Sequence, residues 1–511
     1  MYRRILSALL TVLAVSTLLI GCDSFLQKEP QGEISSENFF RSKADARKAL
    51  SATYDYAQIR SVTWFPPYPM IFGSIASDNA TKGGESGSDQ PSVQRVATFT
   101  TRATDPYVAS TWNTLYTGVY RANQAIANIP DIESMSASAR EQMVGEAKFL
   151  RAYFHFYLLK MYGLGNGRAN DGPGVPLLTE PLPASEADIP RSPESEVWEQ
   201  IETDLADAAS SMSPTAPELG RATQGAANAL KVKAHIFQEE WSKAKTLAEE
   251  IITSGRYQLA PDYSRIFTQS GEYGPGSVFE INHEDLTDGI EGNIGTVYQN
   301  SRGTWGWGFN CPTQELFDAF ASNDPRRDAT IITHGETVTG PQGNSETVEV
   351  VGACSANGPD GYLNQKAWLP AARQPSGPRK GEANLRVIRY AQVLLWHAEA
   401  ANEAGAPQAA LRSLNKVRAR ARDDDANPAN DPSGVLPDIT TTNKAQLRKL
   451  IWNEQRVELA MEYHRFFTLV RQDRASDLLA DQGFQEGKHE RFPIPQAQLD
   501  QSQVLEQNPQ Y

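Results

Sequence analysis

The sequence is poor in cysteine and in positive charge, and it has no apolar run long enough to cross a membrane as a helix. Its 511 residues include only 3 cysteines, too few for a disulfide-dense scaffold. Lys and Arg number 48 against 62 Asp and Glu, so the net charge is −14. A chain this acidic is a poor partner for a phosphate backbone, and we expect no nucleic-acid partner. Hydrophobic residues make up only 40%, which excludes a multi-span membrane protein.

The chain is, however, well supplied with aromatic side chains. It contains 9 Trp, 18 Tyr and 19 Phe, which is too aromatic a composition for a disordered protein. Its length is sufficient for one large domain or two ordinary ones, with material for a buried core. The composition therefore indicates a large, acidic, globular protein.

The N-terminus carries an export signal. Arg3 and Arg4 precede an apolar run over residues 5–20, shorter than the ~20 residues that a spanning helix needs. The run ends in Leu19-Ile20-Gly21-Cys22, which resembles the lipobox of bacterial lipoproteins. That resemblance implies a signal peptide over residues 1–21 and acyl chains, palmitate among them, on Cys22. The alternative is a cleaved soluble export signal with an incidental cysteine. Loss of the signal removes two arginines and no acid, which changes the net charge from −14 to −16.

Helical periodicity dominates much of the remaining chain. Apolar residues recur at helical spacing after Ser42, up to Ala57, and again over 112–129. Ser138-Ala139-Arg140-Glu141 is a capping box, and the apolar face behind it predicts a long, mostly buried helix that ends near Tyr162. Pro193 occupies the first position of another predicted helix. Between the first two helices, residues 64–87 predict a long loop because Pro, Gly, Ser and Asp interrupt the pattern.

Two alanine-rich helix pairs define the predicted architecture. One pair covers 226–251 and the other 389–420, and such pairs bury their faces by stacking, as tetratricopeptide repeats do. About 130 residues between them, 256–383, are glycine-rich and irregular, with short strands expected near 277–282 and 347–351. One last long helix is predicted over 444–479.

Motifs of enzyme chemistry are absent or incomplete. The glycines at 163–167 follow a helix and not a strand, so they fail the dinucleotide-binding context. His283-Glu284 and His397-Ala398-Glu399 lack the further ligands that catalytic zinc requires. Ser86 lies in a turn and not in a nucleophile elbow. We therefore expect no catalysis, no cofactor and no metal site.

Two acidic clusters have structural explanations. Asp423-Asp424-Asp425 lacks the glycine and terminal Glu of an EF-hand loop, so a solvated turn is favoured over a Ca²⁺ site, which stays open. Glu454, Glu458 and Glu462 lie at i, i+4 and i+8, with Arg465 three residues further on. This spacing indicates a ladder of charges or an internal ion pair more than an acid–base pair.

Several sequence blocks, in a fixed order, carry a family resemblance. They are Cys22–Leu26 with Pro30, Phe39-Phe40, Ala44–Ala46, Glu146–Phe154 with Tyr162-Gly163, Pro312–Leu316 with Asp324-Pro325-Arg326, Arg389–Ala391 with Leu394-Leu395 and Ala398–Ala400, Glu454–Ala460 with His464–Arg471, Pro493–Pro495, and Asn508–Tyr511. Together they resemble the SusD/RagB family of outer-membrane nutrient-binding lipoproteins, over nearly the whole mature chain. One departure is Gln472-Asp473, where the family often has Trp-Gly.

The resemblance implies both fold and function. The fold would be mainly α, with tetratricopeptide-like helix pairs in an α-superhelical scaffold over 41–255 and 384–511, a loop-rich insert with short strands over 256–383, and a lipid-anchored leader over 22–40. Residues 41–511 would form a single domain. The protein would face the cell exterior, bind oligosaccharides or polysaccharides without catalysis, and deliver them to a TonB-dependent, SusC-like transporter. Peptide capture by the same architecture is the alternative, and a surface hydrolase is a weaker one.

Loop aromatics are the predicted ligand-binding residues, because sugar rings stack on flat aromatic faces and their hydroxyls bind polar side chains. The aromatic candidates are Trp64, Tyr68, Trp305, Trp307, Tyr362 and Trp368, and the polar ones are Asp78 and Asn79. The first choice is Trp305-Gly306-Trp307, since glycines let a ligand approach the backbone. The alternative is that these aromatics form the insert's own small core.

Cys311 and Cys354 remain once Cys22 is acylated. Both lie in the insert, and an exported protein meets an oxidising environment in which a disulfide persists. A bridge between them and two buried free thiols are the two alternatives.

Overall fold

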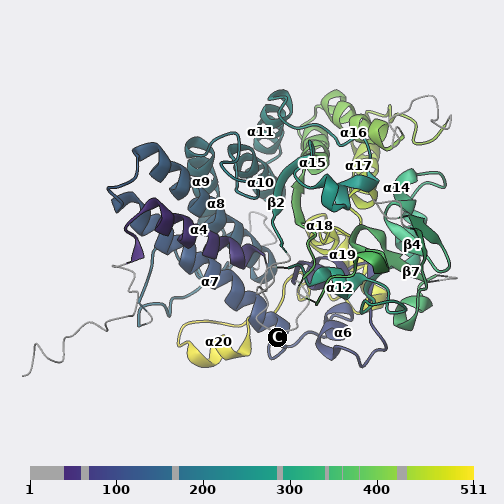
Figure 1. Ribbon diagram of the computed structural model, residues 1–511, viewed down its shortest axis with the longest axis horizontal. Coiled ribbons are helices and arrows are strands. Elements are labelled where there is room, and N and C mark those ends of the chain that lie inside the picture. Colours follow the sequence, from purple (N-terminus) through teal and green to yellow (C-terminus); the bar gives the residue numbers. More distant parts are fainter. Residues whose placement is uncertain are drawn as a thin grey trace, which may run out of the picture.

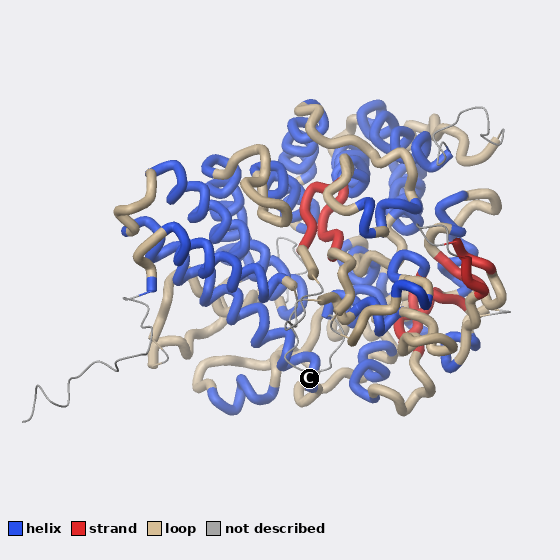
Figure 2. The backbone as a smooth tube through the Cα atoms, in the orientation of Figure 1, coloured by secondary structure: helices blue, strands red, loops and turns tan. Residues whose placement is uncertain are grey.

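A computed structural model describes residues 39–58, 68–163, 172–183, 185–284, 292–339, 345–358, 361–378, 380–422 and 434–511. The predicted anchor Cys22, the candidate Trp64 and the acidic run 423–425 lie outside these residues. The described chain is mainly helical with a few short strands, as Figures 1 and 2 show. The predicted fold class is therefore confirmed, whereas the division into domains stays a prediction.

Four antiparallel helices form the N-terminal part of the scaffold. They are α4 (Lys43–Ala57), α7 (Pro106–Asn128), α8 (Ala137–Tyr162) and α9 (Glu194–Ser211). Ser42 caps α4, in line with the sequence pattern. The cap of α8 is Ser136, whose Oγ accepts from the Ala139 N–H at 3.3 Å, so the capping box predicted at Ser138 is wrong by two residues. Pro193 is the residue before α9 and not its first helical position.

Both predicted helix pairs are present. The first is α10 (Gln224–Phe237) with α11 (Trp241–Thr253), and the second is α15 (Tyr390–Glu403) with α16 (Pro407–Arg422). Helix α11 packs against α15, although about 130 residues separate the two pairs in sequence. The pairs therefore stack as neighbours in space, and the insert leaves and re-enters one continuous scaffold.

The C-terminal helix predicted over 444–479 is broken into three. They are α17 (Lys444–Glu458), α18 (Arg465–Arg471) and α19 (Ala475–Leu478). The break has a backbone cause, because Met461 and Tyr463 adopt left-handed φ values of 63° and 67°. A Cβ on Gly73 would lie 2.0 Å from the Tyr463 carbonyl oxygen, so this turn packs directly on the backbone of the 71–75 segment.

Residues 68–87, predicted as loop, are largely structured and buried. They contain α5 (Tyr68–Met70), the π-helical turn η1 (Ile71–Ile75) and strand β1 (Ala80–Gly83). Ile71, Phe72 and Ile75 belong to the main hydrophobic core. Gly73 in this segment allows close packing of backbones, and only residues 85–87 at its end form the exposed turn that the sequence predicts.

The insert contains short antiparallel strand pairs. These are β1 with β3 (Phe309–Pro312), β2 (Ser277–Ile281) with β8 (Leu385–Arg389), β4 (Ile331–Thr333) with β7 (Tyr362–Asn364), and β5 (Thr337–Thr339) with β6 (Ser345–Thr347). The strand predicted at 277–282 is confirmed, whereas of 347–351 only Thr347 lies in a strand. The β1–β3 pair joins the segment before α6 to the insert.

Shorter elements connect these parts. They are α6 (Pro91–Ala97), α12 (Gly295–Gln299), α13 (Gln314–Ala319), α14 (Pro325–Asp328), α20 (Gln496–Gln501) and the 3₁₀ turns at 129–131, 264–267, 269–271, 352–356, 365–367, 371–373 and 480–482. Among the described helices, none has both the length and the apolar character that a membrane crossing demands.

Candidate functional site

The loop over residues 301–308 carries the first-choice pair, Trp305 and Trp307. The Trp307 N–H donates to the Val297 carbonyl oxygen at 2.8 Å, and its ring meets Tyr298 edge-on with centroids 4.7 Å apart. Trp305 is half-buried, and its indole Nε1 is a buried donor without a partner in the described chain. Trp307 thus fixes the loop to the core, and Trp305 retains an unused polar atom.

Gly306 lies between them for a reason other than ligand access. A Cβ at this position would lie 2.2 Å from the Asn300 carbonyl oxygen, and the Gly306 N–H donates to the Ser301 carbonyl oxygen at 2.8 Å. The loop folds tightly on itself, so only glycine fits. The prediction that this glycine opens the backbone to a ligand is therefore replaced by an internal packing requirement.

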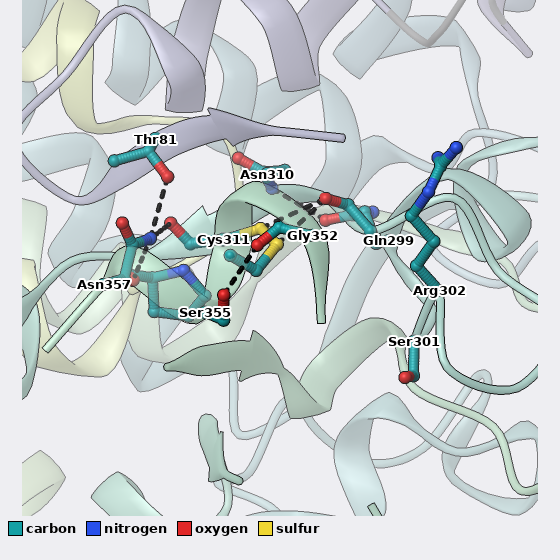
Figure 3. The surroundings of a disulfide bond; sticks show 12 residues. Thr81, Gln299, Ser301, Arg302, Asn310, Cys311, Gly352, Ser355 and Asn357 are labelled. Atoms are coloured by element: carbon teal, nitrogen blue, oxygen red, sulfur yellow. Dashed lines mark hydrogen bonds between the residues drawn. A yellow bond between two sulfur atoms is a disulfide. The ribbon is translucent and has the colours of Figure 1, made fainter. Parts of the chain in front are cut away.

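A disulfide lies next to this loop, three residues after its end. Of the two alternatives for Cys311 and Cys354, the structure has the bridge, with Cα atoms 5.6 Å apart. Asn357 lies on one side of it and donates through Nδ2 to Thr81 Oγ1 at 2.8 Å and to the Cys311 carbonyl oxygen at 3.3 Å (Figure 3). The bridge thereby joins β3, which follows the 301–308 loop, to the 352–356 turn, and Asn357 connects both to Thr81 on β1.

Arg302 extends the connection to the neighbouring loop. Its guanidinium contacts Glu85 at 2.9 Å and Asp89 at 3.6 Å. The Gly84 N–H donates to the Gly308 carbonyl oxygen at 2.6 Å, and the Ala353 N–H donates to the Gly84 carbonyl oxygen at 2.9 Å. Segments from three parts of the chain therefore meet at Arg302 and Gly308, the two ends of the Trp305 loop.

A cavity of about 250 Å³ lies beside Trp368. Phe267 and Trp368 provide aromatic lining, and Gln365, Thr268 and Arg373 provide polar groups. Trp368 Nε1 and Gln365 Oε1 are buried and have no hydrogen-bond partner in the described chain. The cavity thus combines aromatic faces with polar side chains, which is the combination that suits a hydroxyl-rich ligand.

The two surfaces are physically linked. Asn300, which precedes the Trp305 loop, donates through Nδ2 to the Leu369 carbonyl oxygen at 3.0 Å. Trp368 exposes only 7% of its surface and packs in a small core that includes both cysteines of the bridge. Trp368 therefore fits both sequence interpretations, because it belongs to the insert's own core and also lines a cavity.

Tyr362 lies elsewhere and is fully engaged. Its ring stacks on Phe317 with centroids 5.1 Å apart, its hydroxyl donates to Gln314 Oε1 at 2.8 Å, and it is 3% exposed. This burial matches the core alternative and leaves no ring face for a sugar.

Asp78 and Asn79 are components of a buried ion-pair network. Asp78 receives two hydrogen bonds of 2.7 Å from Arg465, and Asn79 Oδ1 accepts from Arg456 Nε at 2.9 Å. Burial favours a raised pKa for the Asp78 carboxyl, but the hydrogen bonds and charges of Arg465 and Arg456 outweigh it and lower the pKa. Arg465 therefore pairs with this carboxylate, whose oxygens are occupied. Tyr68 begins α5, and nothing is described of its side chain.

The acidic ladder on α17 is a buried ion network, in agreement with the structural interpretation of its spacing. Arg326, fully buried, contacts Glu454 at 2.6 Å and Glu458 at 3.0 Å. Arg389 contacts Glu458 at 3.0 Å and Glu462 at 2.7 Å. Burial alone disfavours the charged Glu458, yet the neighbouring guanidinium groups lower its pKa well below the usual range.

This network reaches the cavity through Lys366. Its Nζ contacts Glu462 Oε1 at 2.7 Å, and the Lys366 side chain also lines the cavity beside Trp368. Burial lowers the pKa of Lys366 to about 8 despite the Glu462 charge. Lys366, Gln365 and Phe267 were not singled out from the sequence, because no local pattern marks a residue that reaches a cavity across the fold.

Comparison with known proteins points to one family across most of the chain. A family model described as "SusD family" matches residues 275–511, and one described as "Starch-binding associating with outer membrane" matches 24–234. The curated SusD-like protein P25 of Formosa agariphila is 24% identical over 95% of each chain. SusD-like protein P38 of the same organism is 25% identical over 90% of each chain.

Solved structures share the fold. A laminarin-binding SusD-like protein is 28% identical, with a TM-score of 0.76, and the match covers 92% of this chain and 100% of that one. Surface glycan-binding protein A of Bacteroides thetaiotaomicron, solved with laminarihexaose, is 23% identical, with a TM-score of 0.73 and coverage of 91% and 99%.

Proposed function

This chain belongs to the SusD/RagB family, and from that premise we propose that it binds oligosaccharides or polysaccharides at the outer-membrane surface and delivers them to a partner TonB-dependent, SusC-like transporter. Starch binding and outer-membrane association in the matching family model, and laminarin and laminarihexaose binding in the similar structures, support this proposal. The protein captures its ligand and does not cleave it.

The cavity beside Trp368 is the observation that supports this proposal most directly. Its volume, about 250 Å³, is enough for one or two sugar rings. Aromatic lining suits the C–H faces of a sugar, and the polar lining residues Thr268, Gln365 and Arg373 suit its hydroxyls. We assign the ligand site to Trp368 and to the Trp305–Trp307 loop, and we keep Trp64 and Tyr68 as further candidates from the sequence. Asp78 and Asn79 are engaged by Arg465 and Arg456, and Tyr362 by Phe317 and Gln314, so these three residues are not part of the proposed site.

Binding to a glycan array that includes laminarihexaose tests the proposal. We expect the whole chain to retain at least one glycan, and Trp368→Ala to weaken that binding about tenfold, the loss of roughly one well-packed aromatic contact. Trp368→Phe keeps the aromatic face but removes the indole N–H, so it separates stacking from hydrogen bonding. Trp241→Phe, at the start of α11 away from the cavity, is the matched control.

Two results contradict the proposal. A peptide-library pull-down that succeeds where every glycan fails supports the peptide alternative. Hydrolysis of a bound glycan supports the hydrolase.

Membrane attachment through Cys22 is a separate part of the proposal. A diacylated or triacylated cysteine gives stable anchoring, and the 22–40 leader holds the binding domain near the transporter at high effective concentration. Cells fed labelled palmitate should label the wild-type chain and not Cys22→Ala. A labelled Cys22→Ala variant excludes this anchor. Co-purification of a TonB-dependent transporter with the tagged wild-type chain tests the partnership.

A further inference from the structure

A second cavity, of about 40 Å³, lies between the N-terminal and C-terminal parts of the scaffold. Lys160 at the end of α8 and Lys233 on α10 line it from one part, while Arg456 on α17 and Arg465 and Arg471 on α18 line it from the other. These elements meet near the middle of the molecule in Figure 1. The cavity is distinct from the one beside Trp368, and its volume is too small for a sugar ring.

The two lysines lack acidic partners. Lys233 is 5% exposed, and neither Lys160 nor Lys233 makes a hydrogen bond or an ion pair within the described chain. Their Nζ atoms lie over aromatic rings, with Lys160 3.9 Å from the Tyr157 centroid and 4.0 Å from that of Phe467. Cation–π contacts compensate part of the lost hydration, but they leave N–H donors unused.

Other buried cations of the protein, in contrast, have carboxylate partners. Lys366 is paired with Glu462 at 2.7 Å, and Arg471 is paired with Glu399 at 2.7 Å. Arg456 and Arg465 share Asp78. Five cations therefore line or flank the cavity against two carboxylates, Asp78 and Glu399, both already engaged. The region retains a net positive charge in a buried setting, where an unpaired charge is costly.

The remaining polar lining cannot supply negative charge. Gln392 Oε1 accepts from the Arg389 N–H at 2.7 Å, which directs the Gln392 amide NH₂ to His464 Nε2 at 2.7 Å. His464 is therefore neutral with its proton on Nδ1, and burial followed by the nearby lysines and arginines lowers its pKa. Burial likewise lowers the pKa of Lys233 to about 8.

We propose that this cavity binds a small oxyanion, of the size of sulfate, phosphate or a carboxylate, between the ammonium groups of Lys160 and Lys233. The anion accepts hydrogen bonds from both lysines and neutralises the excess charge. Because Lys160 is on α8 and Lys233 is on α10, the bound anion joins these two helices, with α17 and α18 forming the opposite wall of the cavity.

Thermal unfolding of the whole chain at constant ionic strength tests this site, with sodium sulfate, phosphate or acetate replacing chloride at 0–20 mM. We expect at least one oxyanion to raise the unfolding midpoint saturably by about 1–2 °C. Lys233→Met should weaken the apparent affinity about tenfold or more, while leaving the midpoint in chloride equal or higher. Lys48→Met, at an exposed lysine of α4, should respond as wild type does.

The proposal is overturned if no oxyanion exceeds chloride, or if Lys233→Met keeps the wild-type response. It is also overturned if Lys233→Met lowers the midpoint equally with and without oxyanion, because that result assigns the lysine to packing alone. If Lys233→Met does not fold, Lys160→Met replaces it. Titration calorimetry then measures sulfate binding, and wild-type affinity in Lys160→Met overturns the proposal. Glycan binding is a separate measurement, so failure of either proposal leaves the other intact.

Discussion

The helical scaffold and the loop-rich insert hold their aromatic residues in different ways. In the scaffold, the α8 aromatics Phe149 and Phe156 pack edge-to-face against Phe279, Trp198 and Phe237. Backbone hydrogen bonds there are satisfied within the helices, so apolar packing alone positions these rings. The insert has few such ladders, and it uses a disulfide, side-chain amides bonded to backbone, and ion pairs.

The difference explains where a ligand can bind. Both regions hold buried polar atoms without a partner, His155 on α8 and Trp368 and Gln365 in the insert among them, but Trp368 and Gln365 line a cavity of about 250 Å³. The insert segments are fixed by individual side-chain contacts and not by continuous packing, so they can enclose a cavity without filling it. The same contacts make the insert more dependent on individual residues.

Removing Arg326 gives the largest expected loss, because this side chain joins insert helix α14 to scaffold helix α17. Arg326→Met leaves Asp324, Glu454 and Glu458 with fewer cationic partners in a buried site. We expect about 3–5 kcal/mol less free energy of unfolding in urea titrations. Arg327→Met, at the exposed neighbour that contacts Asp328, should stay within about 0.5 kcal/mol of wild type. Equal effects of the two variants contradict a network that joins the regions.

The same network predicts acid sensitivity. Burial opposes ionisation of Glu458, but the guanidinium groups outweigh it and hold its pKa below the ordinary 4.5. Since the unfolded chain then binds the proton more readily, this stabilisation is present above pH 4.5 and is lost as the pH falls below it. Arg326→Met should reduce that pH dependence.

Removing the disulfide should weaken the insert selectively. The bridge closes a separation of 43 residues, for which the chain-entropy model gives about 4 kcal/mol. In the double variant Cys311→Ala with Cys354→Ala, we expect a loss of about 2–4 kcal/mol and faster amide exchange in 301–308 and 345–358. In α8, amides that exchange through local opening should keep their wild-type rates, because the bridge does not hold that helix. Acceleration confined to α8 would refute the assignment of the bridge to the insert.

In the scaffold, His155 on α8 predicts a second pH-dependent loss of stability. Both of its ring nitrogens are buried without a partner in the described chain, and burial, helped by Arg151, lowers its pKa to about 3. Below pH 6.5 the unfolded chain binds this proton and the folded chain does not, so stability falls as the pH drops toward 3. His155→Leu should reduce the stability lost between about pH 7.5 and 5 by about 2 kcal/mol. Comparison at about pH 8 isolates the packing change, and parallel pH profiles for both proteins contradict the prediction.

Gly306 gives the smallest expected effect and the most local one. Alanine there must displace the Asn300 carbonyl, 2.2 Å from the new Cβ, so we expect a loss of about 1 kcal/mol and a shift of the Trp305 indole. Intrinsic fluorescence and glycan affinity report that shift. Gly87→Ala, whose Cβ meets nothing within 4 Å, is the control. Unchanged glycan affinity in Gly306→Ala would separate the Trp305 loop from the ligand site.

Sequence reasoning succeeded where the physical signal is local. Periodicity and alanine content located α10, α11, α15 and α16, and the i, i+4, i+8 spacing of Glu454, Glu458 and Glu462 indicated their ion-pair role. It failed at the break after α17, since left-handed φ values at Met461 and Tyr463 arise from packing against Gly73. It also could not tell that Asp78 pairs with Arg465, because 387 residues separate the two.

By itself, the sequence determined the helical scaffold, the family resemblance and the list of loop aromatics, because composition, periodicity and motif order are properties of short stretches. Only the tertiary structure decided where those aromatics lie. Tyr362 is stacked and hydrogen-bonded, Trp307 packs on Tyr298, Trp305 is half-buried, and Trp368 lines a cavity from within a small core. It also brought Lys160 and Lys233 together without an acid between them. Whether a polar atom is satisfied depends on partners that are distant in sequence, and the fold alone chooses those partners.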